Sequence, residues 1–142
     1  MALPNGAGGY QIGDGNLNEM FIEAIPEPAA VTAAATLTAA QLLNGILILN
    51  TAAVTSNQAY TLPTVADLEA VLTNSDKTGT SFLFRVVNLG TSSGTATITT
   101  NTGWTLTGSL TMAVPVTSGA VFIARKSSAS GAASAWTLYR VS

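Results

Sequence analysis

Residues 81–100, SFLFRVVNLGTSSGTATITT, decide the fold class that this sequence predicts. Two sets of side chains alternate along the first ten residues, as they do on the two faces of a β-strand. One set comprises Phe82, Phe84 and Val86, and the other comprises Ser81, Leu83, Arg85 and Val87. The segment TSSG favours a turn, and TATITT favours a strand that runs back. We therefore expect an antiparallel hairpin here.

The same kind of pattern recurs along the rest of the chain. Strands are expected at residues 46–50, 59–63, 118–126 and 135–141, with two more within 103–115. Residues 64–74 predict the one clear helix, because Thr64 can cap it and apolar residues share one face. Residues 39–43 predict a short turn, with Thr38 as its candidate N-cap and Asn44-Gly45 as its stop. Strands at this spacing predict a mainly β domain, an antiparallel β-sandwich or jelly-roll-like barrel with one short helix.

Residues 1–35 predict an extended N-terminal arm, and residues 36–142 the β-domain. Glycines near the N-terminus and Pro26 and Pro28 disfavour regular structure in the arm. The arm nevertheless carries apolar side chains that favour burial but have no core of their own. We expect it to bind the surface of a partner through Leu3, Tyr10, Ile12, Leu17, Met20 and Phe21.

The glycine-rich stretch GAGGYQIGDGNLNE, residues 6–19, raises two alternatives to a binding arm. A calcium loop that starts at Asp14 needs Gly at its sixth position and Glu at its twelfth, but Glu19 and Ile25 stand there. A phosphate loop needs a strand before it and a Lys-Ser/Thr pair after it, and neither is present. The stretch is therefore assigned to the arm.

Composition argues against catalysis. The chain of 142 residues has no His and no Cys, which excludes zinc sites of the usual kind and Ser-His-Asp chemistry. Only 8% of the residues are charged, against about 25% in an ordinary soluble domain, as suits a subunit packed among neighbours. We expect no enzymatic activity, no cofactor and no metal.

The charged residues are sorted along the chain. All seven acidic residues precede Lys77, and all five basic residues lie from Lys77 onward. Five scattered cations make a poor nucleic-acid surface, so no nucleic-acid partner is expected. Apolar runs such as residues 46–49 are far shorter than the about 20 residues of a membrane span, so no membrane partner is expected. No secretory signal is expected either, since the N-terminus lacks a basic segment followed by an apolar one.

The aromatic residues leave one further alternative open. Trp104 and Trp136, together with tyrosines, could form a platform on which a glycan stacks. Aromatic side chains in a β-domain more often serve as core or interface anchors, and that interpretation is favoured here.

The order of several segments resembles that of small virion proteins of tailed phages. These segments are TLTAAQLLNGILI, AYTLPTVADLEAVL, GTSFLFRVVNLGTSSGTATI, GWTLTGSLTM and AWTLYRV, and the likeness covers roughly residues 30–142. The leading GGYQIGDGNLNE is also similar to the start of such proteins. The proteins in question are capsid decoration or other head-associated proteins. The acidic, proline-broken part of the arm has no clear counterpart among them.

The resemblance implies a non-catalytic β-domain that binds the major capsid protein of an assembled shell as a homo-oligomer, with a trimer expected. It implies a phage capsid decoration, or cement, protein that stabilises the shell. The chain would be made in the cytoplasm of a bacterial host and would reside on the capsid surface of the virion. The alternatives are another virion component, such as a tail, fibre or minor capsid protein, and a carbohydrate-binding module displayed on the virion.

Overall fold

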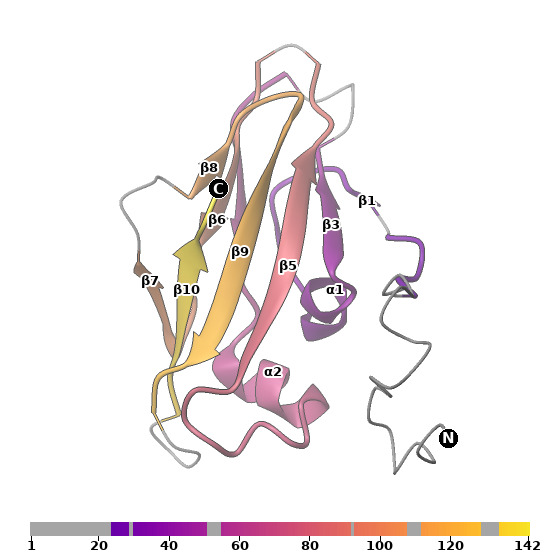
Figure 1. The fold of residues 1–142 in the computed structure, drawn as a ribbon. Helices are drawn as coiled ribbons and strands as arrows, with labels where there is room; N and C mark the ends of the chain where they lie inside the picture. The colour runs from indigo at the N-terminus through magenta and orange to yellow at the C-terminus, as the bar shows by residue number, and fades with distance from the viewer. Residues whose placement is uncertain (1–23, 29, 51–54, 92, 108–111, 129–133) are drawn as a thin grey trace, which may run out of the picture.

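A computed structural model describes residues 24–28, 30–50, 55–91, 93–107, 112–128 and 134–142. These residues form ten strands and two helices, arranged as two β-sheets (Figure 1). The expectation of a mainly β fold is confirmed. Both sheets contribute side chains to one hydrophobic core, and the two helices pack against the same core.

The larger sheet, called sheet A here, has six strands in the order β1-β3-β5-β9-β10-β7. Their bounds are β1 Ala30–Val31, β3 Ile46–Leu49, β5 Ser81–Asn88, β7 Trp104–Thr107, β9 Ser118–Lys126 and β10 Trp136–Arg140. Strand β9 is antiparallel to both of its neighbours, β5 and β10. The outer pairs β1–β3, β3–β5 and β10–β7 are parallel.

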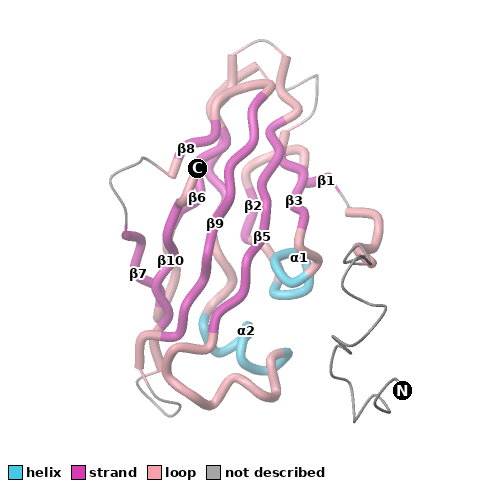
Figure 2. Tube along the Cα trace, in the orientation of Figure 1, coloured by secondary structure: helices cyan, strands magenta, loops and turns pink. Residues whose placement is uncertain are grey.

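The smaller sheet, sheet B, has four strands in the order β2-β4-β6-β8. Their bounds are β2 Ala35–Thr36, β4 Gln58–Thr61, β6 Ala96–Thr99 and β8 Ala113–Val114. The pairs β2–β4 and β4–β6 are parallel, and β6–β8 is antiparallel. In Figures 1 and 2, β5 and β9 lie in front and the strands of sheet B lie behind them.

The expected antiparallel architecture is wrong, because both sheets are mixed. The expected hairpin at residues 81–100 is also wrong: β5 belongs to sheet A, β6 belongs to sheet B, and β5 pairs with β3 and β9 instead. The two short strands expected within 103–115 likewise go to different sheets, as β7 and β8. Side-chain alternation fixes which face of a strand is buried, but it does not select the neighbouring strand.

Two helices are present where one was expected. The predicted helix is confirmed as α2, Val65–Val71, whose N-cap Thr64 accepts the amide hydrogen of Asp67. The second, α1, spans Ala39–Leu43, where a short turn was expected, and the predicted N-cap Thr38 is confirmed. Thr38 and Gln41 form a reciprocal capping box, which satisfies two backbone groups and makes this turn a helix.

Sheet pairing begins earlier in the chain than the expected domain boundary at residue 35. Strand β1 extends sheet A beside β3, and β2 extends sheet B beside β4. The chain between Ala30 and Thr36 therefore crosses from the edge of one sheet to the edge of the other. The part of the predicted arm from residue 30 onward belongs to the folded domain.

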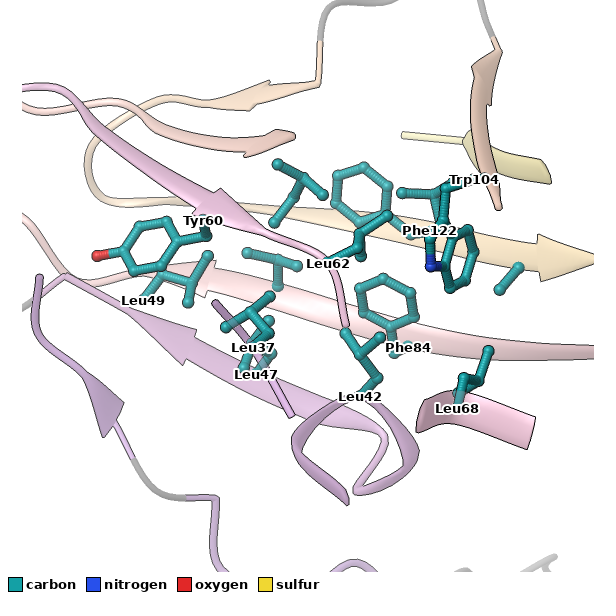
Figure 3. Close-up of a cluster of buried hydrophobic side chains, with 14 of the residues drawn as sticks. Leu37, Leu42, Leu47, Leu49, Tyr60, Leu62, Leu68, Phe84, Trp104 and Phe122 are labelled. Atoms are coloured by element: carbon teal, nitrogen blue, oxygen red, sulfur yellow. The ribbon is translucent and has the colours of Figure 1, made fainter. Parts of the chain in front are cut away.

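The core runs along the space between the sheets. Figure 3 shows Tyr60 near one end of a row of leucines and phenylalanines, with Trp104 and Leu68 near the other end. Phe84 of β5 stacks on Phe122 of β9, with ring centroids 5.5 Å apart. The alternation predicted for residues 81–88 is confirmed, because Phe84 and Val86 are fully buried while Ser81, Leu83 and Arg85 are exposed.

Candidate functional site

All six residues predicted for the binding arm lie outside the described residues. These are Leu3, Tyr10, Ile12, Leu17, Met20 and Phe21. The described part of the chain begins at Ala24, and Ile25 is half-buried. Ala24, Ile25 and Pro26 line a pocket of about 420 Å³ together with residues of β5, and the Asn44 side-chain amide donates a hydrogen bond to the carbonyl of Pro26.

The two tryptophans lie in the core. Trp136 is fully buried, and only 7% of the surface of Trp104 is exposed. The indole N–H of Trp104 donates to the carbonyl of Pro63 at 2.7 Å, and that of Trp136 donates to Glu69 Oε1 at 2.9 Å. Because the rings are enclosed and tilted against each other at 6.2 Å, they offer almost no open face on which a glycan could stack.

Glu69 is the centre of a cluster of polar side chains at one end of the core. It projects from α2, and its Oε1 accepts three hydrogen bonds. The donors are Lys126 Nζ at 2.5 Å, Ser134 Oγ at 2.5 Å and Trp136 Nε1 at 2.9 Å. Lys126 is fully buried at the end of β9, while 20% of the Glu69 side chain is exposed.

Burial alone would raise the pKa of the Glu69 carboxyl. The hydrogen bonds from Lys126, Ser134 and Trp136, together with the Lys126 charge, outweigh burial and hold this pKa below its ordinary value. The carboxylate is therefore ionised at neutral pH, and the buried ammonium has the counter-charge that it requires. A pocket of about 260 Å³ lies beside the cluster, lined by Thr64, Gly103 and others. An ionised carboxylate that already accepts three hydrogen bonds suits a structural link between α2, β9 and β10 better than a general base.

The sequence analysis did not identify this ion pair. A signal for it exists in SGAVFIARK, residues 118–126. In a strand, alternate residues share a face, so Lys126 falls on the same face as Phe122 and Ala124. A lysine on the buried face of a strand needs an acidic partner, but nothing in the sequence says that the partner is Glu69, 57 residues away.

A second buried polar network closes the opposite end of the core. The hydroxyl of Tyr60 donates to Asn50 Oδ1 at 2.6 Å, and Asn50 Nδ2 donates to Asn88 Oδ1 at 2.9 Å. Asn88 Nδ2 donates to the carbonyls of Gly94 and Val114, both at 2.9 Å. These bonds link strands of the two sheets at one end of the core. Burial, which outweighs a hydrogen bond with Asn50, raises the pKa of the Tyr60 hydroxyl.

The side of sheet A that faces away from the core carries mostly apolar side chains. We call it the outer face, and it comprises Ile46, Ile48, Leu83, Arg85, Val87, Val121, Ile123, Arg125 and Tyr139. Leu83 is 42% exposed, and the other apolar members are half-buried. No described helix or strand lies across β5 and β9 on this side in Figure 2.

The strand register places these side chains in rows. Leu83 of β5 and Tyr139 of β10 flank Ile123 of β9, and Arg85 pairs with Val121. The neighbours in such a row stand about 5 Å apart, so they form one continuous surface. Arg85 and Arg125 are the only charged residues on the outer face, and no acidic residue lies on it. The outer face is therefore an apolar surface with a positive charge.

The described residues contain no group of three or more His, Cys, Asp or Glu that could hold a metal ion. No helix among them is long and apolar enough to cross a membrane. Comparison of the chain with protein-family models, with curated proteins and with solved structures gave no match.

Proposed function

We propose that this chain is a non-catalytic structural subunit of a tailed-phage virion, and specifically a capsid decoration protein. In this role it binds the major capsid protein of the assembled head as a homo-oligomer, a trimer, and stabilises the shell. It is made in the host cytoplasm and resides on the capsid surface. The two sheets form the layers of a β-sandwich that carries the N-terminal arm.

The observation that supports this proposal most is the outer face of sheet A. No described helix or strand covers this apolar, positively charged face (Figure 2), and a face of this kind suits a subunit that makes contacts within an assembly. The low content of charged residues, 8%, points in the same direction. The two buried polar networks have the bonding of structural links and lie inside the domain.

The resemblance of the sequence to head-associated phage proteins supplies the identity of the assembly. In the proposed mechanism, residues 1–23 lie across neighbouring capsid subunits and join them. Ordering such an arm costs about 1–2 kcal/mol per residue in backbone entropy. Burial of its apolar side chains at about 1.5–3 kcal/mol each offsets only a part. Backbone hydrogen bonds to a sheet edge and the many copies on one shell provide the remainder.

Co-sedimentation with undecorated shells of the encoding phage tests the proposal. Light scattering first gives the oligomeric state of the purified protein. We expect an oligomer that pellets with the shells and saturates at a stoichiometry that matches the shell symmetry. A variant that lacks residues 1–23 should fold, as judged by circular dichroism, and should no longer pellet. A protein that stays in the supernatant at every concentration contradicts the capsid assignment.

A further inference from the structure

We infer that, in the free subunit, residues 10–23 dock on the outer face of sheet A of the same chain. This inference concerns the subunit alone and does not depend on capsid binding. It names an occupant for an apolar surface that no described helix or strand covers (Figure 2). Three independent features of the chain support it: the place where the segment joins the domain, its charge and its apolar content.

The segment joins the domain at the border of the outer face. Ala24, its immediate neighbour in the chain, lines the same pocket as Leu83 and Arg85, which are both members of that face. From β5 to β10 the face spans two strand spacings, or about 10 Å. Fourteen residues in extended conformation reach about 46 Å, so residues 10–23 are long enough to cross the face.

The charges of the segment and of the face are opposite. Residues 10–23 contain three acidic residues and no basic one: Asp14, Glu19 and Glu23. The outer face contains Arg85 and Arg125 and no acidic residue. In a dimer formed by the outer faces of two copies, the arginines of one copy would lie against those of the other. This repulsion disfavours such a dimer. The acidic segment is therefore a better partner for this face than the face itself.

The apolar side chains of the segment also suit the apolar outer face. The segment carries Tyr10, Ile12, Leu17, Met20, Phe21 and Ile22. Leu83, Val121 and Ile123 of the face have exposed area that such side chains can cover. Because the segment is tethered at Ala24, its effective concentration at the face of its own chain is in the millimolar range, which favours docking within one chain over exchange between chains.

Photo-crosslinking of the full-length chain tests the inference. Phe21 is replaced by p-benzoylphenylalanine, and a mixture of ¹⁵N-labelled and unlabelled chains is irradiated. Trypsin then gives few peptides, since the basic residues are only Lys77, Arg85, Arg125, Lys126 and Arg140. We expect position 21 to be crosslinked to residues of β3, β5, β9 or β10 of the same chain. A link to β3 lies within the peptide of residues 1–77, and a link to β5, β9 or β10 joins that peptide to a second one of the same isotopic kind. Crosslinks that avoid these four strands, or that join labelled to unlabelled chains, overturn the inference.

Limited proteolysis with chymotrypsin gives a second readout. Cleavage after Tyr10 and Phe21 should become about fivefold or more faster in the double variant Arg85→Glu/Arg125→Glu, because two exposed ion pairs become repulsive. The control Lys77→Glu changes an exposed basic residue outside the outer face and should leave the rate unchanged. Adding Asp14→Arg and Glu19→Arg to the double variant should restore slow cleavage. Equal rates in the wild type and the double variant contradict docking.

The two readouts separate this inference from the proposed function. Crosslinks to the outer face in a protein that never pellets with shells would leave the inference standing and remove the capsid role. A protein that pellets with shells but shows no such crosslinks would support the capsid role and remove the inference of docking within one chain.

Discussion

The buried ion pair between Lys126 and Glu69 predicts large losses of stability when either partner is changed alone. Breaking a buried pair typically costs about 3–5 kcal/mol, because one charge is left in the interior without its counter-charge. Lys126→Met leaves a carboxylate that keeps two neutral donors and is 20% exposed, so a loss near about 3 kcal/mol is expected. Glu69→Gln leaves a fully buried ammonium, so the loss should approach about 5 kcal/mol.

The double variant Glu69→Gln/Lys126→Met should recover most of this loss. The Gln carbonyl can still accept hydrogen bonds from Ser134 and Trp136, and the Met side chain fills the space of the lysine stem without a charge. We expect the double variant to lie within about 1 kcal/mol of the wild type. Urea denaturation followed by tryptophan fluorescence measures these energies, with Trp136 in direct contact with Glu69 as the probe.

The pair also predicts the dependence of stability on pH. The folded-state pKa of Glu69 is lower than the ordinary value of 4.5, so the carboxylate stabilises the fold above that pH. As the pH falls from about 4.5 through the folded-state pKa, the unfolded chain takes up the proton first, and the free energy of unfolding decreases. Glu69→Gln should lack this contribution. The matched control Lys77→Met, at an exposed lysine, should stay within about 0.5 kcal/mol of the wild type. A loss below about 1 kcal/mol in either single variant would refute the reasoning.

Three further predictions follow from local geometry. Gly103→Ala should lower the free energy of unfolding by about 3 kcal/mol in thermal unfolding, because Gly103 has a φ of +87° and a new Cβ would lie 2.7 Å from side-chain carbons of α2. The control Gly79→Ala has a similar φ of +94°, but its new Cβ would lie 4.0 Å from the nearest atom. It should cost only about 1 kcal/mol. Tyr60→Phe should cost about 1–2 kcal/mol at pH 7 in urea titrations. The raised pKa of Tyr60 stabilises the fold below the unfolded-state pKa of 10.0, and this contribution is lost as the pH rises through the folded-state pKa, so the variant should lose less stability in alkali than the wild type. Acrylamide should quench the fluorescence of Trp104 and Trp136 weakly in the folded protein and strongly in urea, and strong quenching without urea would contradict their burial.

Local patterns predicted the elements of the fold well. The strand at residues 118–126 has the expected bounds, and the helix at residues 64–74 begins beside its predicted cap. Such features depend on neighbouring residues only: alternation over a strand, or a threonine that caps the following turn. At residues 39–43 a short turn with Thr38 as N-cap was expected; the cap is confirmed, and the reciprocal bond of Gln41 completes the capping box of helix α1.

The pairing of strands and the candidate site could not be predicted in the same way. Residues 81–88 and 96–99 are separated by a short, turn-like segment, which favours a hairpin, yet they enter different sheets. Buried bonds from Asn88 to the carbonyls of Gly94 and Val114 hold the crossing in place. Gly94 lies in the connecting segment and Val114 lies on β8, and nothing in the local pattern shows that Asn88 binds both.

The sequence by itself determined that this protein is mainly β, that Phe84 and Val86 share one face of their strand, and that it lacks the residues of the commonest catalytic and zinc sites. Only the tertiary structure decided that the sheets are mixed, that Lys126 is paired with Glu69, and that one face of sheet A is left apolar and positive. The physical reason is the distance along the chain over which each interaction acts. Alternation and capping act between residues a few positions apart. The choice of neighbouring strand and the pairing of a buried charge are instead set by packing among segments distant in the chain.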